Sequence, residues 1–158
     1  MGHRVMLTII RIFIGLVLLV SGFEKLMSPY QNFLYVIQAY AMFPLLPGIP
    51  GWSPSGLEKL AALSVPWVEL MAGIFLSLGL WTDWSLKGAL LLFGSFIVIV
   101  GQALLRGLPI DQCGCFGENI HILPQYIIVF DSVMLLSIFW LLRHPSKTKI
   151  FSLDNNLK

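Results

Sequence analysis

Four long apolar runs constrain what this chain can fold into more than any other feature of its sequence. They cover residues 5–23, 65–81, 86–105 and 126–142. A helix that crosses the hydrocarbon core of a bilayer needs roughly 17 to 25 mostly apolar residues, and each run falls in that range. Backbone groups in lipid must form hydrogen bonds within the protein, which favours helices. The sequence therefore predicts an all-α fold, an integral membrane four-helix bundle.

The composition supports a membrane protein of a single domain, residues 1–158. Charged residues make up 11% of the chain and hydrophobic residues 57%, with a mean hydropathy of +0.84. A soluble domain carries about 25% charged residues, so this chain has too few to cover a water-facing surface. A net charge of +2 without a basic block argues against nucleic acid as a partner. Arg11 inside the first run disfavours a cleaved signal peptide.

The connection between the first two runs predicts a cap on the bundle. Residues 27–64 are rich in proline and glycine. Residues 31–42 are apolar and aromatic, which favours a short helix at the membrane interface. Residues 55–63 predict one or two helical turns that lead into Pro66. We expect a helical and irregular extracytoplasmic cap rather than a second domain.

The orientation in the membrane follows from the basic residues near the ends of the runs, because cytoplasmic loops carry an excess of Lys and Arg. The side with the two termini holds six of them, and the other side holds three. The six are Arg4, Lys87, Arg143, Lys147, Lys149 and Lys158, and the three are Lys25, Lys59 and Arg106. We therefore expect cytoplasmic termini and an extracytoplasmic segment between the third and fourth runs.

That segment contains the only two cysteines of the chain, Cys113 and Cys115, separated by one glycine. Outside the cytoplasm disulfides persist, and a disulfide across one residue closes a small ring that strain makes easier to reduce. Such a pair suits thiol/disulfide exchange with another protein. Two other interpretations stay open: inert buried cysteines, and a soft-metal site completed by His121. The metal interpretation is the weaker of the two because no second cysteine pair is present, so we assign no metal ligands.

Ionisable residues inside the runs are the second group of candidate site residues, because charges in a membrane are expensive and commonly functional. Arg11, Glu69 and Asp131 must face the bundle rather than lipid. The first run carries a stripe at spacings of four and three, which permits close approach by a neighbouring helix. Its members are Arg11, Gly15, Leu18, Gly22 and Lys25. Glu69 and Gly73 form a similar face on the second run.

Depth along the runs limits which of these residues can meet. Glu69 and Asp131 both lie in the outer parts of their runs, whereas Arg11 lies towards the cytoplasmic side. Glu24 and Lys25, at the outer end of the first run, are better placed to pair with the two carboxylates than Arg11 is. The network either supports chemistry in the extracytoplasmic segment or only fixes the register of the helices.

Several of these stretches together resemble a known family. The pattern of the first run resembles that of DoxX-like membrane proteins, the second run matches it, and the cysteine segment followed by Asp131 resembles the MauE branch. The stretches are Arg11-x3-Gly15 with Ser21-Gly22-Phe23-Glu24-Lys25-Leu26 and Pro29, then Pro66-Trp67-x-Glu69-x3-Gly73, then Cys113-Gly114-Cys115-Phe116-Gly117. The resemblance covers about residues 5–142 and implies a four-helix membrane protein associated with maturation of methylamine dehydrogenase in the periplasm.

These observations lead to one hypothesis for the function and two alternatives. The hypothesis is a thiol/disulfide component of the bacterial inner membrane, in which Cys113 and Cys115 exchange electrons with a periplasmic thioredoxin-like protein or a client enzyme. The alternatives are a non-enzymatic scaffold for a periplasmic client and a metal-handling membrane protein. The sequence leaves open whether the chain is an enzyme. It also leaves the cofactor unknown, because a quinone follows from the DoxX analogy only.

Overall fold

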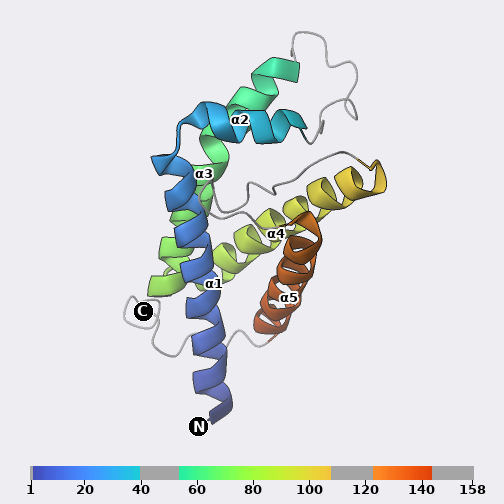
Figure 1. Cartoon of the computed structure of the whole chain (residues 1–158). Helices are drawn as coiled ribbons and strands as arrows, with labels where there is room; N and C mark the ends of the chain where they lie inside the picture. Colours follow the sequence, from blue (N-terminus) through green and yellow to red (C-terminus); the bar gives the residue numbers. More distant parts are fainter. Residues whose placement is uncertain (1, 40–53, 108–122, 144–158) are drawn as a thin grey trace.

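The computed structural model describes residues 2–39, 54–107 and 123–143, and in them the chain is helical (Figure 1). The helices are α1 (Gly2–Met27), α2 (Tyr30–Ala39), α3 (Pro54–Leu78), α4 (Thr82–Leu105) and α5 (Pro124–Leu142). Four helices are long and apolar enough to cross a membrane, over Val5–Met27, Glu58–Leu78, Thr82–Leu105 and Gln125–Leu142. The predicted all-α class and the four spans are confirmed.

The distribution of polarity is inverted relative to a water-soluble protein. Arg11 and Glu69 are completely buried, whereas Leu91 is 73% exposed and Leu105 is 91% exposed. An outward apolar surface with inward charges is the arrangement that lipid requires. The core between the helices is formed by apolar side chains of α1, α3, α4 and α5. Its members include Leu7, Ile14, Leu18, Leu76, Leu86, Phe93, Met134, Ile138 and Leu141.

Helix α1 lies directly against α3, with their backbones in contact at glycines. A Cβ atom built at Gly73 would lie 2.6 Å from the backbone nitrogen of Leu19, and one at Gly22 would lie 2.8 Å from the backbone oxygen of Pro66. Real Cβ atoms essentially never approach so closely. Small residues let membrane helices approach each other in this way. The stripe predicted from the spacing of Gly15 and Gly22 on α1 is therefore confirmed as the α3 contact.

Helix α3 differs from the prediction at both ends. It begins at Pro54 and continues through Pro66, so the turns predicted at residues 55–63 and the span predicted at 65–81 form one helix. Proline lacks a backbone N–H and removes one helical hydrogen bond, but helices in membranes tolerate this where neighbouring groups compensate. The break predicted between residues 63 and 65 was therefore wrong, because the helix continues through Pro66.

A glycine turn ends α3 three residues before the predicted end of the span at Trp81. Gly79 has a φ of 69°, in the left-handed region that favours glycine. The N–H of Leu80 donates to the carbonyl oxygen of Phe75 at 2.9 Å, the 6→1 bond of a Schellman motif. Helix α4 then begins at Thr82, earlier than the predicted start at residue 86. The α3–α4 turn is thus very short, and the two helices are antiparallel neighbours.

Helix α2 is the described part of the predicted cap. Figure 1 shows it across the ends of α1 and α3, and it contacts α3. The side-chain nitrogen Nε2 of Gln38 donates to Oε2 of Glu58 at 3.1 Å, which ties α2 to the first turns of α3. The short helix predicted within residues 31–42 is therefore confirmed over its described part. Its placement on the extracytoplasmic side stays a prediction.

Candidate functional site

A buried ion pair joins α1 and α3 at the end of the bundle that α2 covers. Nζ of Lys25 lies 2.6 Å from Oε1 of Glu69 and 2.8 Å from Oε2. The side chains of Lys25 and Glu69 are 1% and 0% exposed, respectively. Charge-assisted hydrogen bonds of this length are among the strong ones in proteins. The expectation that Lys25 pairs with a carboxylate inside the membrane is confirmed.

Ser21 completes the hydrogen bonding of this pair. Its Oγ accepts a bond from Nζ of Lys25 at 3.0 Å and donates one to Oε2 of Glu69 at 3.0 Å. A lysine ammonium has three donors and a serine hydroxyl has one. The three donors of Lys25 are directed at the two oxygens of Glu69 and at Ser21. Together these three residues form the Lys25 cluster.

Two aromatic rings surround the ammonium group from other helices. Nζ of Lys25 lies 5.2 Å from the ring centroid of Phe33 on α2 and 5.0 Å from that of Phe96 on α4. A cation over the face of an aromatic ring is attracted by the ring quadrupole, more strongly where water is absent. Lys25 therefore holds together side chains from α1, α2, α3 and α4.

Asp131 brings the fifth helix to the same place. It lies on α5, is 4% exposed, and is close enough for its charge to interact with those of Lys25 and Glu69. Within the part of the chain that the structure describes, its Oδ2 is buried and has no hydrogen-bond partner. The prediction that Asp131 faces the bundle interior is confirmed. All five helices thus contribute a side chain at or beside the Lys25 cluster.

The sequence positions this cluster through the spacing of small and polar residues on α1. Ser21 and Lys25 are four residues apart, which places them one above the other on a helix face. Gly22 lies between them where the backbones of α1 and α3 are in close contact, and a Cβ there would be 3.2 Å from Cβ of Glu69. This close approach brings the carboxylate of Glu69 within reach of Lys25. A larger residue at position 22 would hold the two groups apart.

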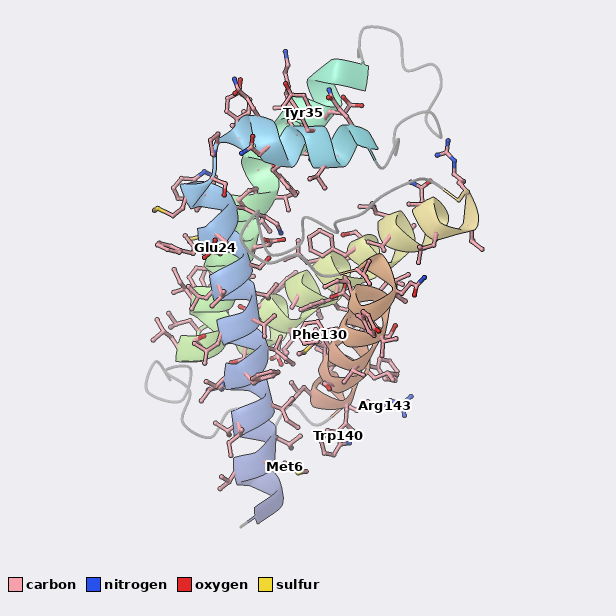
Figure 2. The ribbon with its side chains drawn as sticks, in the orientation of Figure 1. Met6, Glu24, Tyr35, Phe130, Trp140 and Arg143 are labelled. Atoms are coloured by element: carbon pink, nitrogen blue, oxygen red, sulfur yellow. The ribbon has the colours of Figure 1, made fainter. Side chains whose placement is uncertain are left out.

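Two other predicted residues lie outside the cluster. Arg11 is completely buried, as predicted, but it precedes Lys25 by about 21 Å along α1 at the usual helical rise. Glu24 is half-buried, whereas Lys25 pairs with Glu69. Figure 2 shows Glu24 near the end of α1 that leads to α2. Of the two residues proposed to pair with the carboxylates, Lys25 does so.

Sequence reasoning did not assign a role to three of the residues found here. Ser21 could have been found, because it lies one helical turn before Lys25 and next to Gly22 of the predicted stripe. Phe33 and Phe96 could not, since a phenylalanine in an apolar helix gives no signal of its partner. Both become visible only when α2 and α4 are placed against α1.

The cysteine segment lies outside the described residues, and so does His121. Cys113 and Cys115 belong to residues 108–122, which connect the end of α4 to the start of α5. Because successive spans alternate in direction, that connection leaves the bundle on the same side as the α1–α2 connection. In the described part of the chain, no group of three or more His, Cys, Asp and Glu residues could hold a metal ion.

Comparison with known proteins places the chain in a family. No curated protein and no solved structure matches it significantly. The wider grouping with DoxX-like proteins stays a prediction. One family model, described as methylamine utilisation protein MauE, matches residues 3–144. That match spans nearly the whole chain, including every described helix, and the chain therefore belongs to the MauE family.

Proposed function

We propose that this protein is a membrane component of thiol/disulfide exchange in the maturation of an extracytoplasmic client, with Cys113 and Cys115 as the exchanging pair. Membership of a methylamine-utilisation family supports a role in that pathway. The client is then an enzyme of methylamine utilisation or a thioredoxin-like protein that serves it. The membrane is the bacterial inner membrane, with both termini in the cytoplasm.

The Lys25 cluster is the single observation that carries this proposal furthest. Together with Asp131 it places three ionisable groups within a membrane bundle, where charges are costly and commonly serve function. They lie on the side of the bundle from which the cysteine segment leaves, by the alternation of the spans. Asp131 is about 10 Å along α5 from Pro124, the first residue of that helix. The cluster contacts α4 through Phe96 and lies beside Asp131 on α5, and these are the two helices that flank the cysteine segment.

The exchange consists of two thiol/disulfide steps. A client thiolate attacks one sulfur of the Cys113–Cys115 disulfide and forms a mixed disulfide, and the other cysteine leaves as a thiolate. The second client thiolate then attacks the mixed disulfide, which leaves a client disulfide and a Cys113–Cys115 dithiol. Two electrons pass from the client to the pair, and the two thiol protons lost by the client are balanced by the two taken up by Cys113 and Cys115. A disulfide of a thioredoxin-like protein accepts the two electrons in turn and regenerates the pair.

The test is to follow the redox state of the two cysteines in intact cells with an alkylating reagent that adds mass to free thiols. We expect both the dithiol and the disulfide, in a ratio that changes when a membrane-impermeant oxidant or reductant is added. Cys113→Ser should leave a mixed disulfide with a partner that is visible on a non-reducing gel, and the double Cys113→Ser/Cys115→Ser variant is the control. A pair locked in one redox state under every condition contradicts the proposal.

Growth of the native host on methylamine separates exchange from scaffolding. If the cysteines exchange electrons, the double serine variant should not support growth, although the protein is still present in the membrane. Asp83→Asn, on the half-exposed start of α4, should support normal growth as a matched control. Normal growth of the double serine variant would favour a non-enzymatic scaffold instead.

A further inference from the structure

The hydrogen-bond donors of the Lys25 cluster are used within the cluster and are not directed at Asp131. The four donors of the Lys25 cluster are directed within the cluster, three from Lys25 and one from Ser21. None of them is directed at Asp131. The other described groups that face the ammonium are the rings of Phe33 and Phe96, which carry no donor for a carboxylate.

A buried carboxylate needs a donor far more than a buried carboxylic acid does. Buried polar atoms are nearly always hydrogen-bonded, and an ionised carboxylate without donors pays a large desolvation penalty. Oδ2 of Asp131 is buried without a partner in the described structure, although the residue lies beside an ion pair. A proton on Asp131 removes the charge and, with it, most of that desolvation penalty.

The balance of charge points in the same direction. The group contains two carboxylates, Glu69 and Asp131, and one ammonium, Lys25, which is already bound by both oxygens of Glu69. Arg11 is about 21 Å away along α1 and does not compensate the second carboxylate. With both carboxylates ionised, the group would hold a net negative charge in a medium that penalises it. One bound proton makes it neutral.

We propose that Asp131 is an intramembrane proton-binding site, which holds an exchangeable proton while Lys25 is bound by Glu69 and Ser21. Release of the proton leaves two carboxylates competing for one ammonium. Lys25 then turns partly towards Asp131, and the attraction between α1 and α5 increases at the expense of the α1–α3 bonds. The site therefore links proton binding to the packing of α5 against the α1–α3 pair, and it does not depend on the proposed thiol chemistry.

The test is infrared spectroscopy of the purified full-length protein in lipid nanodiscs at neutral pH. A protonated carboxylic acid in a dry site shows a carbonyl stretch that is separate from the bands of carboxylates and amides and that shifts in D₂O. We expect this band in the wild-type protein, its loss in Asp131→Asn and its retention in Asp83→Asn. If the wild-type protein shows no such band, the proposal is overturned; this result is expected if Asp131 binds a metal cation as a carboxylate. A band that persists in Asp131→Asn also overturns it.

Thermal unfolding in the same nanodiscs gives an independent readout. Asparagine has nearly the shape of a protonated aspartic acid and is likewise neutral, so Asp131→Asn should keep the unfolding temperature of the wild-type protein. Glu69→Gln should lower that temperature, because it removes the counter-ion of Lys25. If Asp131→Asn lowers the unfolding temperature as much as Glu69→Gln, or fails to fold, Asp131 is an ionised counter-ion and the proposal is wrong.

Discussion

A single methyl group added at Gly73 should disrupt the bundle more than one added at another glycine of the same membrane domain. The new Cβ of Gly73→Ala would lie 2.6 Å from the backbone nitrogen of Leu19 and 2.8 Å from the backbone oxygen of Gly15. Both contacts are with backbone, so no side chain can rotate away. To restore an ordinary contact of 3.4 Å, the two helices must separate by most of an ångström.

That separation acts on two kinds of interaction. Overpacking of a well-packed interface costs about 1–3 kcal/mol. The separation also stretches the bonds between Lys25 and Glu69, whose shortest distance is 2.6 Å. We therefore expect Gly73→Ala to reduce the free energy of unfolding by about 2–4 kcal/mol, the sum of the overpacking and a partial loss of the ion pair.

Gly101 on α4 is the matched control. A Cβ built there meets nothing within 4 Å, so Gly101→Ala should be neutral or should stabilise α4 by about 1 kcal/mol through its helix propensity. The assay is thermal or denaturant unfolding of both variants in the same detergent, followed by tryptophan fluorescence. If Gly73→Ala is as stable as Gly101→Ala, the close backbone contact between α1 and α3 is not part of the fold in the membrane.

Three further results are expected from the Lys25 cluster. Lys25→Met should reduce the free energy of unfolding by about 3–5 kcal/mol, because it leaves Glu69 buried without a counter-ion. The double variant Lys25→Met/Glu69→Leu should recover most of that loss. A double-mutant cycle in detergent measures both effects, and additive effects of the two substitutions would contradict the ion pair. Phe96→Leu should cost about 1–2 kcal/mol through the lost cation–π contact and core packing, while Phe23→Leu, at a position 52% exposed, should cost less than half as much in the same unfolding assay. Glu24→Gln should leave the unfolding midpoint almost unchanged, since Glu24 is half-buried and Lys25 has Glu69 as its buried counter-ion. A loss as large as that of Lys25→Met would show that Glu24 belongs to the cluster.

Much of the membrane architecture could be predicted from the sequence, because the bilayer imposes a single strong requirement on every span. Length and polarity were enough to find four helices, and the cost of burying charge was enough to turn Arg11, Glu69 and Asp131 inwards. The stripe on α1 also predicted the α3 contact. Each of these predictions depends on one helix at a time.

The errors arose where two local signals competed. Pro66 was taken as a boundary, yet α3 continues through it because a proline in a membrane helix can be accommodated by neighbouring backbone and side chains. Trp81 was included in the second span, although Gly79 already ends the helix. With α3 extended to Glu58 at its start, Glu69 lies near the middle of that helix, whereas its partner Lys25 lies near the end of α1.

The composition of the site could be predicted only in part. The pairing of Lys25 with a carboxylate followed from depth, but the choice of Glu69 over Asp131 depends on the distance at which Gly22 lets α3 approach. The rings of Phe33 and Phe96 depend on the placement of α2 and α4. Such contacts between helices carry no periodic signal along the chain.

The ion pair between the first and second spans has a consequence for how the protein enters the membrane. Glu69 lies within an apolar span, and a lone ionised carboxylate there opposes insertion by up to about 3 kcal/mol, the cost at the centre of a span. Lys25 lies near the end of its own helix, where its long side chain can reach the headgroups before α3 has been synthesised. During synthesis α1 therefore provides the counter-charge for Glu69 before α3 is made, and the two spans enter the lipid as a helical hairpin in which this carboxylate is paired.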